Sequence, residues 1–394
     1  MSIDRPYFLN YIFSDQRINI SLVIIFTAAF ISVSAPLAAA VPASSSAGWH
    51  LNITWQSLPG QYRGTLHGHT TNSDGVFTPA VFLTNYRDNG SDFQAITDHS
   101  VITKDPQVKG ITYISGSEYS VMSNGGHMNG VWLSGKTTPS TNAVIIAQRI
   151  RDSGGKVIFN HPGSPTKGWT FKEIKAAAKP YDFYEMYDPG YPTIESYYDQ
   201  MLQNNITMWA TADDDDHSFK DGRFLKSYDV VNAYNSTSSE IKRQMSLGNF
   251  YAAMLDNGSY ARINSISTSD GHNVVITSPD MCNFIWYTKD GVVKITNNTN
   301  TDSYDANPDD MYVRAELVLD NIPRLKSWTQ PMLVENGSLS PTVCYGSLSP
   351  TVGLKTTPEY SNVGSIACIL FIILIISAGA IAIMVIVRGL RPRN

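Results

Sequence analysis

Six of the eight histidines lie, together with several carboxylates, in one stretch of this 394-residue chain, between residues 67 and 217. They come at or just beyond the ends of predicted strands, which is where parallel α/β barrels build their active sites. Imidazole and carboxylate together suit zinc, manganese or iron, and three cysteines are too few for a multi-cysteine zinc module. A single histidine would more often be a surface or core residue, but the set predicts a metal centre. The candidate ligands are His67, His69, Asp74, His99, Glu118, His127, His161, Asp215 and His217.

Short apolar runs alternate with helix-like segments through the same stretch, which predicts a parallel sheet covered by helices. Six or more strand–helix units are consistent with a closed or distorted barrel. Thr78 and Pro79 open one helix as its cap and first turn, and Gly90 closes it. The predicted strands are 62–66, 92–97, 111–115, 156–160, 182–186 and 207–212, and the predicted helices are 78–90, 141–154, 171–179 and 193–204.

From about residue 261 the pattern changes to short β-rich runs separated by turns, which predicts a small antiparallel β domain. A helix at 240–247 precedes it, with Thr237 and Glu240 at the spacing of a capping box. The domain has no comparable ligand cluster, and His50 and His272 are expected to be structural or exposed. Its role is therefore predicted to be stability more than chemistry. The predicted strands are 261–267, 273–276, 283–287, 292–296 and 312–318.

Apolar segments at both ends predict a membrane-anchored, exported protein. Residues 366–387 carry no charge and are long enough to span roughly 30 Å of hydrocarbon as a helix. Arginines follow in the last seven residues, which favours a cytoplasmic tail and an extracytoplasmic body. Near the start, arginines precede the apolar run 18–33, and alanines at 38–40 offer a cleavage site. This segment is either a secretory signal peptide or an uncleaved anchor.

The composition and net charge limit the kinds of molecule that the protein is expected to bind. Charged residues make up 16% of the chain, against a usual share of about 25%, and the net charge is −5. With no basic run before the tail, a double-stranded nucleic acid is not an expected partner. Seven sequons give weak support for export and for glycosylation. Their asparagines are Asn52, Asn89, Asn205, Asn235, Asn257, Asn297 and Asn336.

The histidine and carboxylate motifs, taken in order, resemble those of the PHP (polymerase and histidinol phosphatase) superfamily between about residues 62 and 218. A looser resemblance links residues 247–251, 312–316 and 328–331 to PHP-type metallohydrolases with a C-terminal β domain. The motifs are Leu66-His67-Gly68-His69-Thr70, Ser73-Asp74-Gly75, Thr97-Asp98-His99, Gly116-Ser117-Glu118, His127, Asn160-His161-Pro162 and Asp215-Asp216-His217.

The resemblance implies a distorted (β/α)7 PHP barrel that holds two or three divalent metal ions. The first ion would take His67, His69, Glu118 and Asp215; the second would share Glu118 and add His127 and His161; the third would use Asp74, His99 and His217. Asp74 replaces a histidine found in some relatives. The run of aspartates from 213 to 216 leaves open a slip of one residue at Asp215.

Hydrolysis is the chemistry that such a centre suits. A carboxylate shared by two cations holds them about 3.5 to 4 Å apart, and an acidified bridging water can attack phosphorus in line. Glu118, Asp215 and His217 are the expected catalytic residues. Asp98 and Glu185 are candidates to orient imidazoles, or else solvated or helix-capping carboxylates. Possible phosphate contacts, each more simply a surface charge, are Arg63, Lys104, Lys220 and Arg223.

The predicted protein is a membrane-anchored extracytoplasmic phosphoesterase acting on a small-molecule phosphate ester. The alternatives are the same centre acting on a carboxylic ester, amide or carbamate, and a non-catalytic metal-binding surface protein. The expected organisation is a signal peptide or anchor at 1–40, a metallohydrolase domain at 50–234, a helix and β domain at 235–335, a Ser/Pro/Thr stalk at 336–364, a transmembrane helix at 365–387 and a basic cytoplasmic tail at 388–394.

Overall fold

The computed structural model describes residues 48–336, except for 122–124, 320–321 and 323–324. The predicted signal or anchor, most of the stalk, the transmembrane helix and the tail lie outside the described residues. Within the described ranges, no helix combines the length and the apolar character needed to cross a bilayer.

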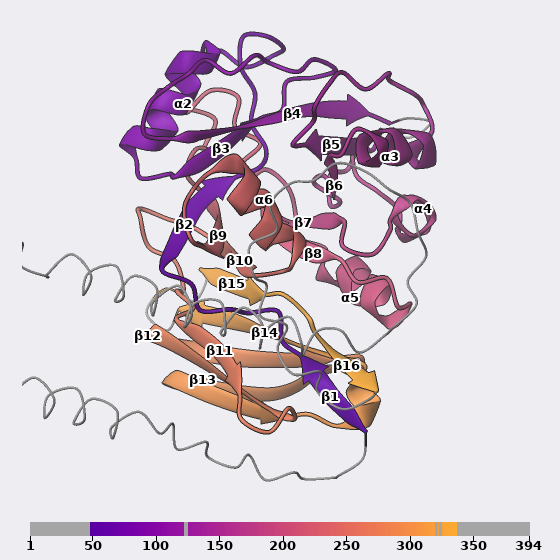
Figure 1. Cartoon of the computed structure of the whole chain (residues 1–394), viewed down its shortest axis with the longest axis vertical. Coiled ribbons are helices and arrows are strands. Elements are labelled where there is room, and N and C mark those ends of the chain that lie inside the picture. Colours follow the sequence, from indigo (N-terminus) through magenta and orange to yellow (C-terminus); the bar gives the residue numbers. More distant parts are fainter. Residues whose placement is uncertain (1–47, 122–124, 320–321, 323–324, 337–394) are drawn as a thin grey trace, which may run out of the picture. The chain divides into compact units, whose positions relative to one another are not determined.

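The first part of the fold is a curved mixed sheet with helices around it (Figure 1). Its strand order is β10-β9-β2-β3-β4-β5-β6-β7-β8, and the seven strands from β2 to β8 follow the chain. The bounds are β2 (Gly60–Thr65), β3 (Phe93–Ile96), β4 (Thr112–Ser120), β5 (His127–Val131), β6 (Lys156–Phe159), β7 (Phe183–Tyr187), β8 (Trp209–Ala212), β9 (Ser227–Ala233) and β10 (Phe250–Met254).

The expected parallel pattern holds for two groups of strands and fails between them. Strands β2, β3 and β4 are parallel, and so are β6, β7 and β8. Strand β5, which the sequence pattern did not predict, runs antiparallel to both β4 and β6. Strand β8 approaches β9 through a hydrogen bond from the Ala212 amide to Asp229, at 3.1 Å. The sheet is therefore strongly curved and parallel only in part.

Helices cover the outer face of this sheet, at the positions that the sequence pattern predicts. Helix α2 buries Phe82, Leu83 and Tyr86, and the Thr78 hydroxyl accepts the Val81 amide at its start. The predicted capping box of α6 is not formed, because Thr237 makes no side-chain cap bond. Glu240 instead accepts the Tyr234 amide at 3.3 Å. The bounds are α2 (Pro79–Asp88), α3 (Ala143–Asp152), α4 (Phe171–Ala177), α5 (Glu195–Gln203) and α6 (Ser238–Ser246).

The second part is a β domain built on one long hairpin. The runs predicted at 273–276 and 283–287 are a single 16-residue strand, β12, with alternating burial. Its partner β13 pairs with no other described strand and leaves Val292 and Ile295 more than half exposed. The elements are β1 (Trp49–Asn52), β11 (Ser265–Thr268), β12 (Asn273–Thr288), β13 (Gly291–Asp305), η1 (Pro308–Asp310), β14 (Tyr312–Leu319), β15 (Lys326–Thr329) and β16 (Met332–Asn336).

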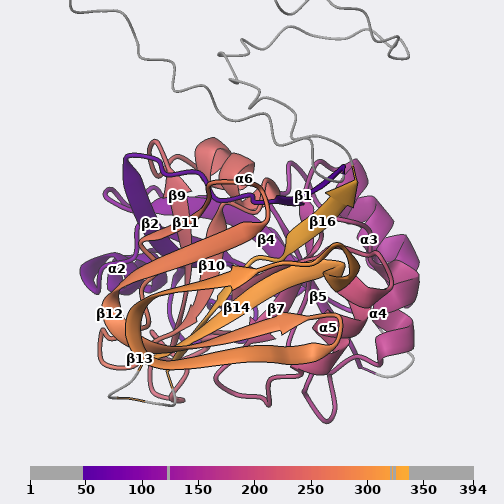
Figure 2. The same ribbon diagram turned by 90° about the horizontal axis from the view of Figure 1, so that it is seen from below.

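The strands β12, β13 and β14 of the β domain lie against the barrel (Figure 2), and a buried charged contact joins the two. Arg314 of β14 is 1% exposed, bonds Asp199 of α5 at 2.8 Å and lies over the Tyr287 ring at 3.9 Å. The Trp328 indole donates to Glu195 of the same helix at 3.3 Å. Both contacts are made to α5, which therefore joins the barrel to the β domain.

Candidate metal centre

The nine predicted ligands converge at one end of the barrel, as the sequence analysis expected. They lie where β2, β3, β6 and β8 end, and along β4 and the start of β5. Ligand atoms of eight of the nine form three overlapping groups, and within each group these atoms lie within 4.8 Å of one another. His161 lies outside the groups, with its Nε2 3.3 Å from Glu118 Oε1, so the second group has His99 where the sequence predicted His161. The groups are His67, His69, Glu118 and Asp215; His99, Glu118 and His127; and His69, Asp74, His99 and His217.

The first group is fully buried and matches the set predicted for the first ion. Asp215 Oδ1 lies 3.1 Å from His67 Nε2 and 3.2 Å from His69 Nε2. Glu118 approaches the same two nitrogens at 3.4 and 3.2 Å. Two imidazole nitrogens and two carboxylates facing one point, without a sulfur ligand, are a donor set that divalent Zn, Mn or Fe accepts.

Glu118 is the centre of the whole cluster. Its Oε1 lies 2.9 Å from His127 Nδ1 and 3.3 Å from His161 Nε2, and its Oε2 lies 3.3 Å from His99 Nδ1. The Asn160 amide donates to Oε1 at 2.8 Å and so fixes the carboxylate. A carboxylate that faces imidazoles on both sides is placed to bridge two cations.

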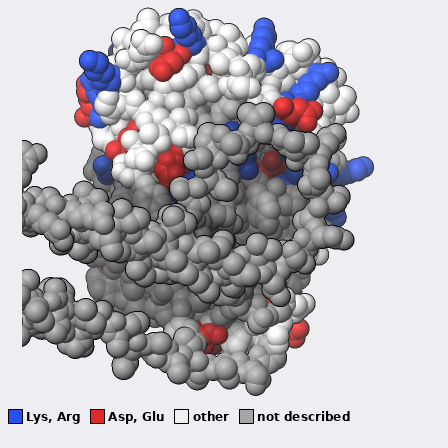
Figure 3. Space-filling view, viewed as in Figure 1, with Lys and Arg blue, Asp and Glu red and all other residues white. Residues whose placement is uncertain are grey.

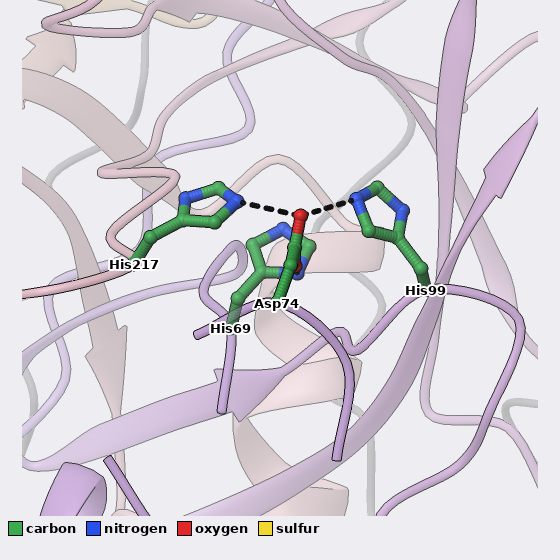
Figure 4. Close-up of side chains that lie close together, drawn as sticks. All are labelled: His69, Asp74, His99 and His217. Carbon is green, nitrogen blue, oxygen red and sulfur yellow. Dashed lines mark ion pairs between the residues drawn. The ribbon is translucent and has the colours of Figure 1, made fainter. Parts of the chain in front are cut away.

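The third group is the most open one (Figure 4). Asp74 Oδ2 lies 3.3 Å from His99 Nε2 and 3.4 Å from His217 Nε2, while Asp74 Oδ1 lies 3.4 Å from His69 Nδ1. The Asp74 side chain is 51% exposed, against 1% for Glu118. A cation held here would have positions left for water or substrate.

Two ligands are oriented by neighbours of the cluster. His67 Nδ1 lies 2.9 Å from Glu185 Oε1, which turns Nε2 towards the first group, as the sequence analysis suggested for Glu185. The other Glu185 oxygen accepts the backbone amide of His161. His217 Nδ1 lies 2.8 Å from the Asp215 carbonyl oxygen, so its Nε2 faces Asp74. Contacts of this kind fix the ring orientation of a metal ligand.

Asp98 acts differently from the expectation. Its carboxylate accepts the amide and hydroxyl of Thr70, both at 2.7 Å, and the Ser73 hydroxyl at 2.8 Å. Asp98 therefore holds the loop that carries Asp74, and no hydrogen bond from it to a described imidazole is found. The hydroxyls of Thr70 and Ser73 were the sequence signal for this role, since both adjoin predicted ligands.

The run of four aspartates has one member in the cluster, Asp215. Asp213 accepts the Leu66 amide, Asp214 accepts the Tyr86 hydroxyl at 2.9 Å, and Asp216 accepts the Phe219 amide at 3.0 Å. Asp215 has a positive φ of 47°, a backbone conformation in which its carboxylate meets His67 and His69. The slip of one residue that the sequence left open is thus not observed.

The electrostatics of the site suit exchange of protons for cations. Burial raises the pKa of Glu118, but His67 and hydrogen bonds from His127 and His161 bring it well below its usual range. Burial lowers the pKa of His69, but hydrogen bonds to Asp215 and Glu118 more than offset this and raise it to about 9. In the metal-free protein, protons on His67 and His69 therefore balance the buried carboxylates, and a bound cation can replace them.

Comparisons with known proteins return solved structures only. No protein-family model matches the chain, and no curated protein matches it. The chain is similar to a two-domain Bacteroides vulgatus protein containing a predicted PHP-like metal-dependent phosphoesterase, with 15% identity, a TM-score of 0.42 and coverage of 72% of this chain and 97% of that one. It is also similar to the lesion-specific Endonuclease Q of Pyrococcus furiosus, with 16% identity, a TM-score of 0.38 and coverage of 48% and 56%.

Both TM-scores lie below 0.5 and both identities below 25%, so these likenesses carry no argument about the activity of this chain. The motifs occur in the order of the PHP superfamily, and their histidines and carboxylates meet in one cluster with three candidate metal groups. The cluster has the donor types of a metal centre, and the motifs that form it resemble those of the PHP superfamily.

Proposed function

We propose that this protein is a phosphoesterase with a two- or three-metal centre in a distorted (β/α)7 barrel. The observation that carries the proposal is the position of Glu118, whose two oxygens face imidazoles of all three ligand groups. Divalent cations held by these groups would supply Lewis acidity at the phosphoryl oxygens and an acidified water as nucleophile.

The chain's own residues have three tasks in this proposal. His67, His69 and Asp215 form a buried floor, which keeps bulk water away from one side of the site. Glu118 joins the groups and fixes their spacing. His217 lies at the open side beside Asp74, where substrate arrives, so it is placed to contact the phosphoryl group.

The third ligand group favours a phosphate ester over a carboxylic ester, amide or carbamate. A phosphoryl group carries several charged oxygens, whereas a carbonyl develops one oxyanion, so an additional cation near Asp74 benefits phosphoryl transfer more. Chromogenic phosphomonoesters, phosphodiesters and carboxylic esters should be assayed side by side on the metal-loaded protein. Turnover of carboxylic esters alone would replace this function, and metal binding without any turnover would favour the non-catalytic alternative.

A small molecule fits as substrate better than duplex DNA. Endonuclease Q, one of the similar structures, has been solved with a 27-mer duplex that carries an abasic lesion, but the present chain spans only 56% of its length. The net charge of this chain is −5. Where described residues are visible in Figure 3, basic and acidic side chains are interspersed, whereas a DNA-binding surface gathers basic side chains along the phosphate backbone. Competition of duplex DNA with a small phosphate ester tests this choice.

We further propose that the catalytic body is extracytoplasmic and held by the apolar segment at 365–387. The asparagines of all seven sequons are exposed, whereas Asn129, Asn160, Asn232 and Asn249, which are buried, are outside sequons. Protease added to intact cells should release a fragment that contains residues 67–328. A body that stays protected in intact, protease-accessible cells would contradict the location without touching the proposed chemistry.

A further inference from the structure

Arg223 lies against the metal centre, in the segment that follows His217. Its Nη1 donates to Asp215 Oδ2 and lies 3.5 Å from Asp188 Oδ1. Its guanidinium also lies over the Tyr191 ring, 5.0 Å from the centroid. The Arg223 side chain is only 18% exposed, so Arg223 is a largely buried residue and not a surface charge.

The loop formed by residues 188–191 is shaped around this guanidinium. A Cβ at Gly190 would lie 2.3 Å from Arg223 Nη2, so only glycine fits while the arginine keeps its place. The Gly190 amide donates to Asp188 Oδ1 at 2.6 Å, and the Tyr191 ring lies 5.0 Å from the His161 ring. The loop thus joins Arg223 to ligands on two sides of the cluster.

The contact with Arg223 makes the two carboxylate oxygens of Asp215 unequal. Oδ1 faces His67 Nε2 and His69 Nε2, at 3.1 and 3.2 Å, whereas Oδ2 faces the arginine. We propose that Arg223 is a positioning residue that restricts Asp215 to one-oxygen ligation of its cation and so keeps a coordination position free. This inference rests on the proposed metal centre, and it assigns Arg223 no direct contact with substrate.

Charge gives the expected direction of the effect. A fixed cation beside a ligand opposes binding of a second cation and also withdraws electron density from the carboxylate. Loss of the guanidinium should therefore tighten metal binding, on the order of tenfold, while both Asp215 oxygens become available to the ion. A residue that merely stabilised the loop would give weaker binding or no change.

Cobalt(II) is a suitable probe, because its visible absorption is intense in four-coordinate sites and weak in six-coordinate ones. Arg223→Ala should bind cobalt more tightly than wild type, with weaker absorption per bound ion and lower kcat. Gly190→Ala should act in the same direction to a smaller extent, since its methyl displaces the guanidinium and leaves every charge in place. Gly190 does not have a positive φ, so alanine is compatible with its backbone.

The matched control is Gly135→Ala, because a Cβ there would meet no atom of the described chain within 4 Å. It should leave affinity and spectrum unchanged. If Arg223→Ala fails to fold because Asp188 loses its partner, Gly190→Ala still decides the question. A folded Gly190→Ala protein with wild-type affinity and spectrum, or with weakened binding, would overturn the role of Arg223. Failure of the wild-type protein to bind cobalt would instead remove the metal centre itself.

Discussion

The metal end of the barrel and its junction with the β domain both bury charge, but they balance it differently. At the junction, Arg314 is a permanent cation and meets Asp199 and Glu195, so the charge is balanced once the chain folds. At the metal end, Glu118 lies among imidazoles, whose charge depends on bound protons. An external cation can replace those protons, whereas it has no place at the junction. Changes at the metal end should therefore affect metal content and turnover, and changes at the junction should affect stability.

Glu118→Gln should have the largest effect on turnover. The amide keeps the size of the side chain but loses the charge that faces five imidazoles, so two cations are affected at once. We expect turnover to fall by roughly a thousandfold or more, with the fold largely kept. Steady-state kinetics and circular dichroism measure the two quantities. Turnover close to that of wild type would show that Glu118 is not part of the site, and the contrast between the metal end and the junction would then be wrong.

His99→Ala should separate the open group from the buried ones. Wild-type protein should contain more than two metal equivalents, falling by about one in the variant, with most phosphoesterase turnover lost. Metal analysis of the purified protein checks this. Two equivalents in wild type, unchanged in the variant, would contradict a three-metal centre and favour the ester or amide alternative.

Metal affinity should rise with pH until His69 loses its proton. Burial lowers its pKa, but bonds to Asp215 and Glu118 raise it from 6.5 to about 9 in the metal-free protein. Below that pH, a cation must displace this proton, so binding weakens as pH falls. The same shift stabilises the metal-free fold fully below about pH 6.5, and this stabilisation disappears as pH rises through about 9. Cobalt titrations across this range test the affinity; a flat profile would show that no ligand proton is displaced.

Arg314→Leu should lower the stability of the protein and leave its metal binding unchanged, in contrast to the changes at the metal end. It leaves Asp199 and Glu195 without their buried cation, and we expect a loss of about 3 kcal/mol in the free energy of unfolding. The metal affinity of the folded fraction should stay that of wild type. Urea denaturation and cobalt titration on the same sample give both values. Loss of metal from folded Arg314→Leu protein would show that the two regions are coupled.

His272→Ala should have the smallest effect. The His272 ring lies tilted against the Trp49 ring, with 4.2 Å between centroids, and its Nε2 lies 3.1 Å from the Trp49 carbonyl oxygen. A stability change within about 1 kcal/mol and unchanged turnover are expected. His161→Ala is the comparison, and equal loss of activity in two folded variants would contradict the division between the regions.

The sequence predicted the site better than the path of the chain around it. Ligand types and spacing are local properties, so nine residues could be named, of which eight form the three groups and His161 contacts Glu118 beside them. Strand β5 was missed because residues 127–131 include Asn129 and Gly130 in place of an alternating apolar pattern. Its antiparallel direction follows from its hydrogen bonds to β4 and β6, which local propensity does not encode.

Some contacts of the site could not be predicted from the sequence and are visible only in the tertiary structure. Asp98 follows a strand and directly precedes a ligand, which suggested an imidazole partner. In the structure it instead accepts hydrogen bonds from the hydroxyls of Thr70 and Ser73. From the sequence, Arg223 was a possible phosphate contact or a surface charge, and its position beside Asp215 and the loop at 188–191 is visible only in the structure. Adjacency in sequence thus located the site but not the partners of its supporting residues.

The four consecutive aspartates make this segment intolerant of insertion and deletion. Each carboxylate has a different partner, from the Leu66 amide to the ligand cluster, the Tyr86 hydroxyl and the Phe219 amide. Deleting a single codon would leave three aspartates in place, so an alignment would score the segment as nearly intact. The remaining carboxylates would nevertheless be shifted along the chain and would no longer face their own partners. A change of chain length between Ala212 and His217 should therefore disturb the site, even where the aspartates themselves are kept.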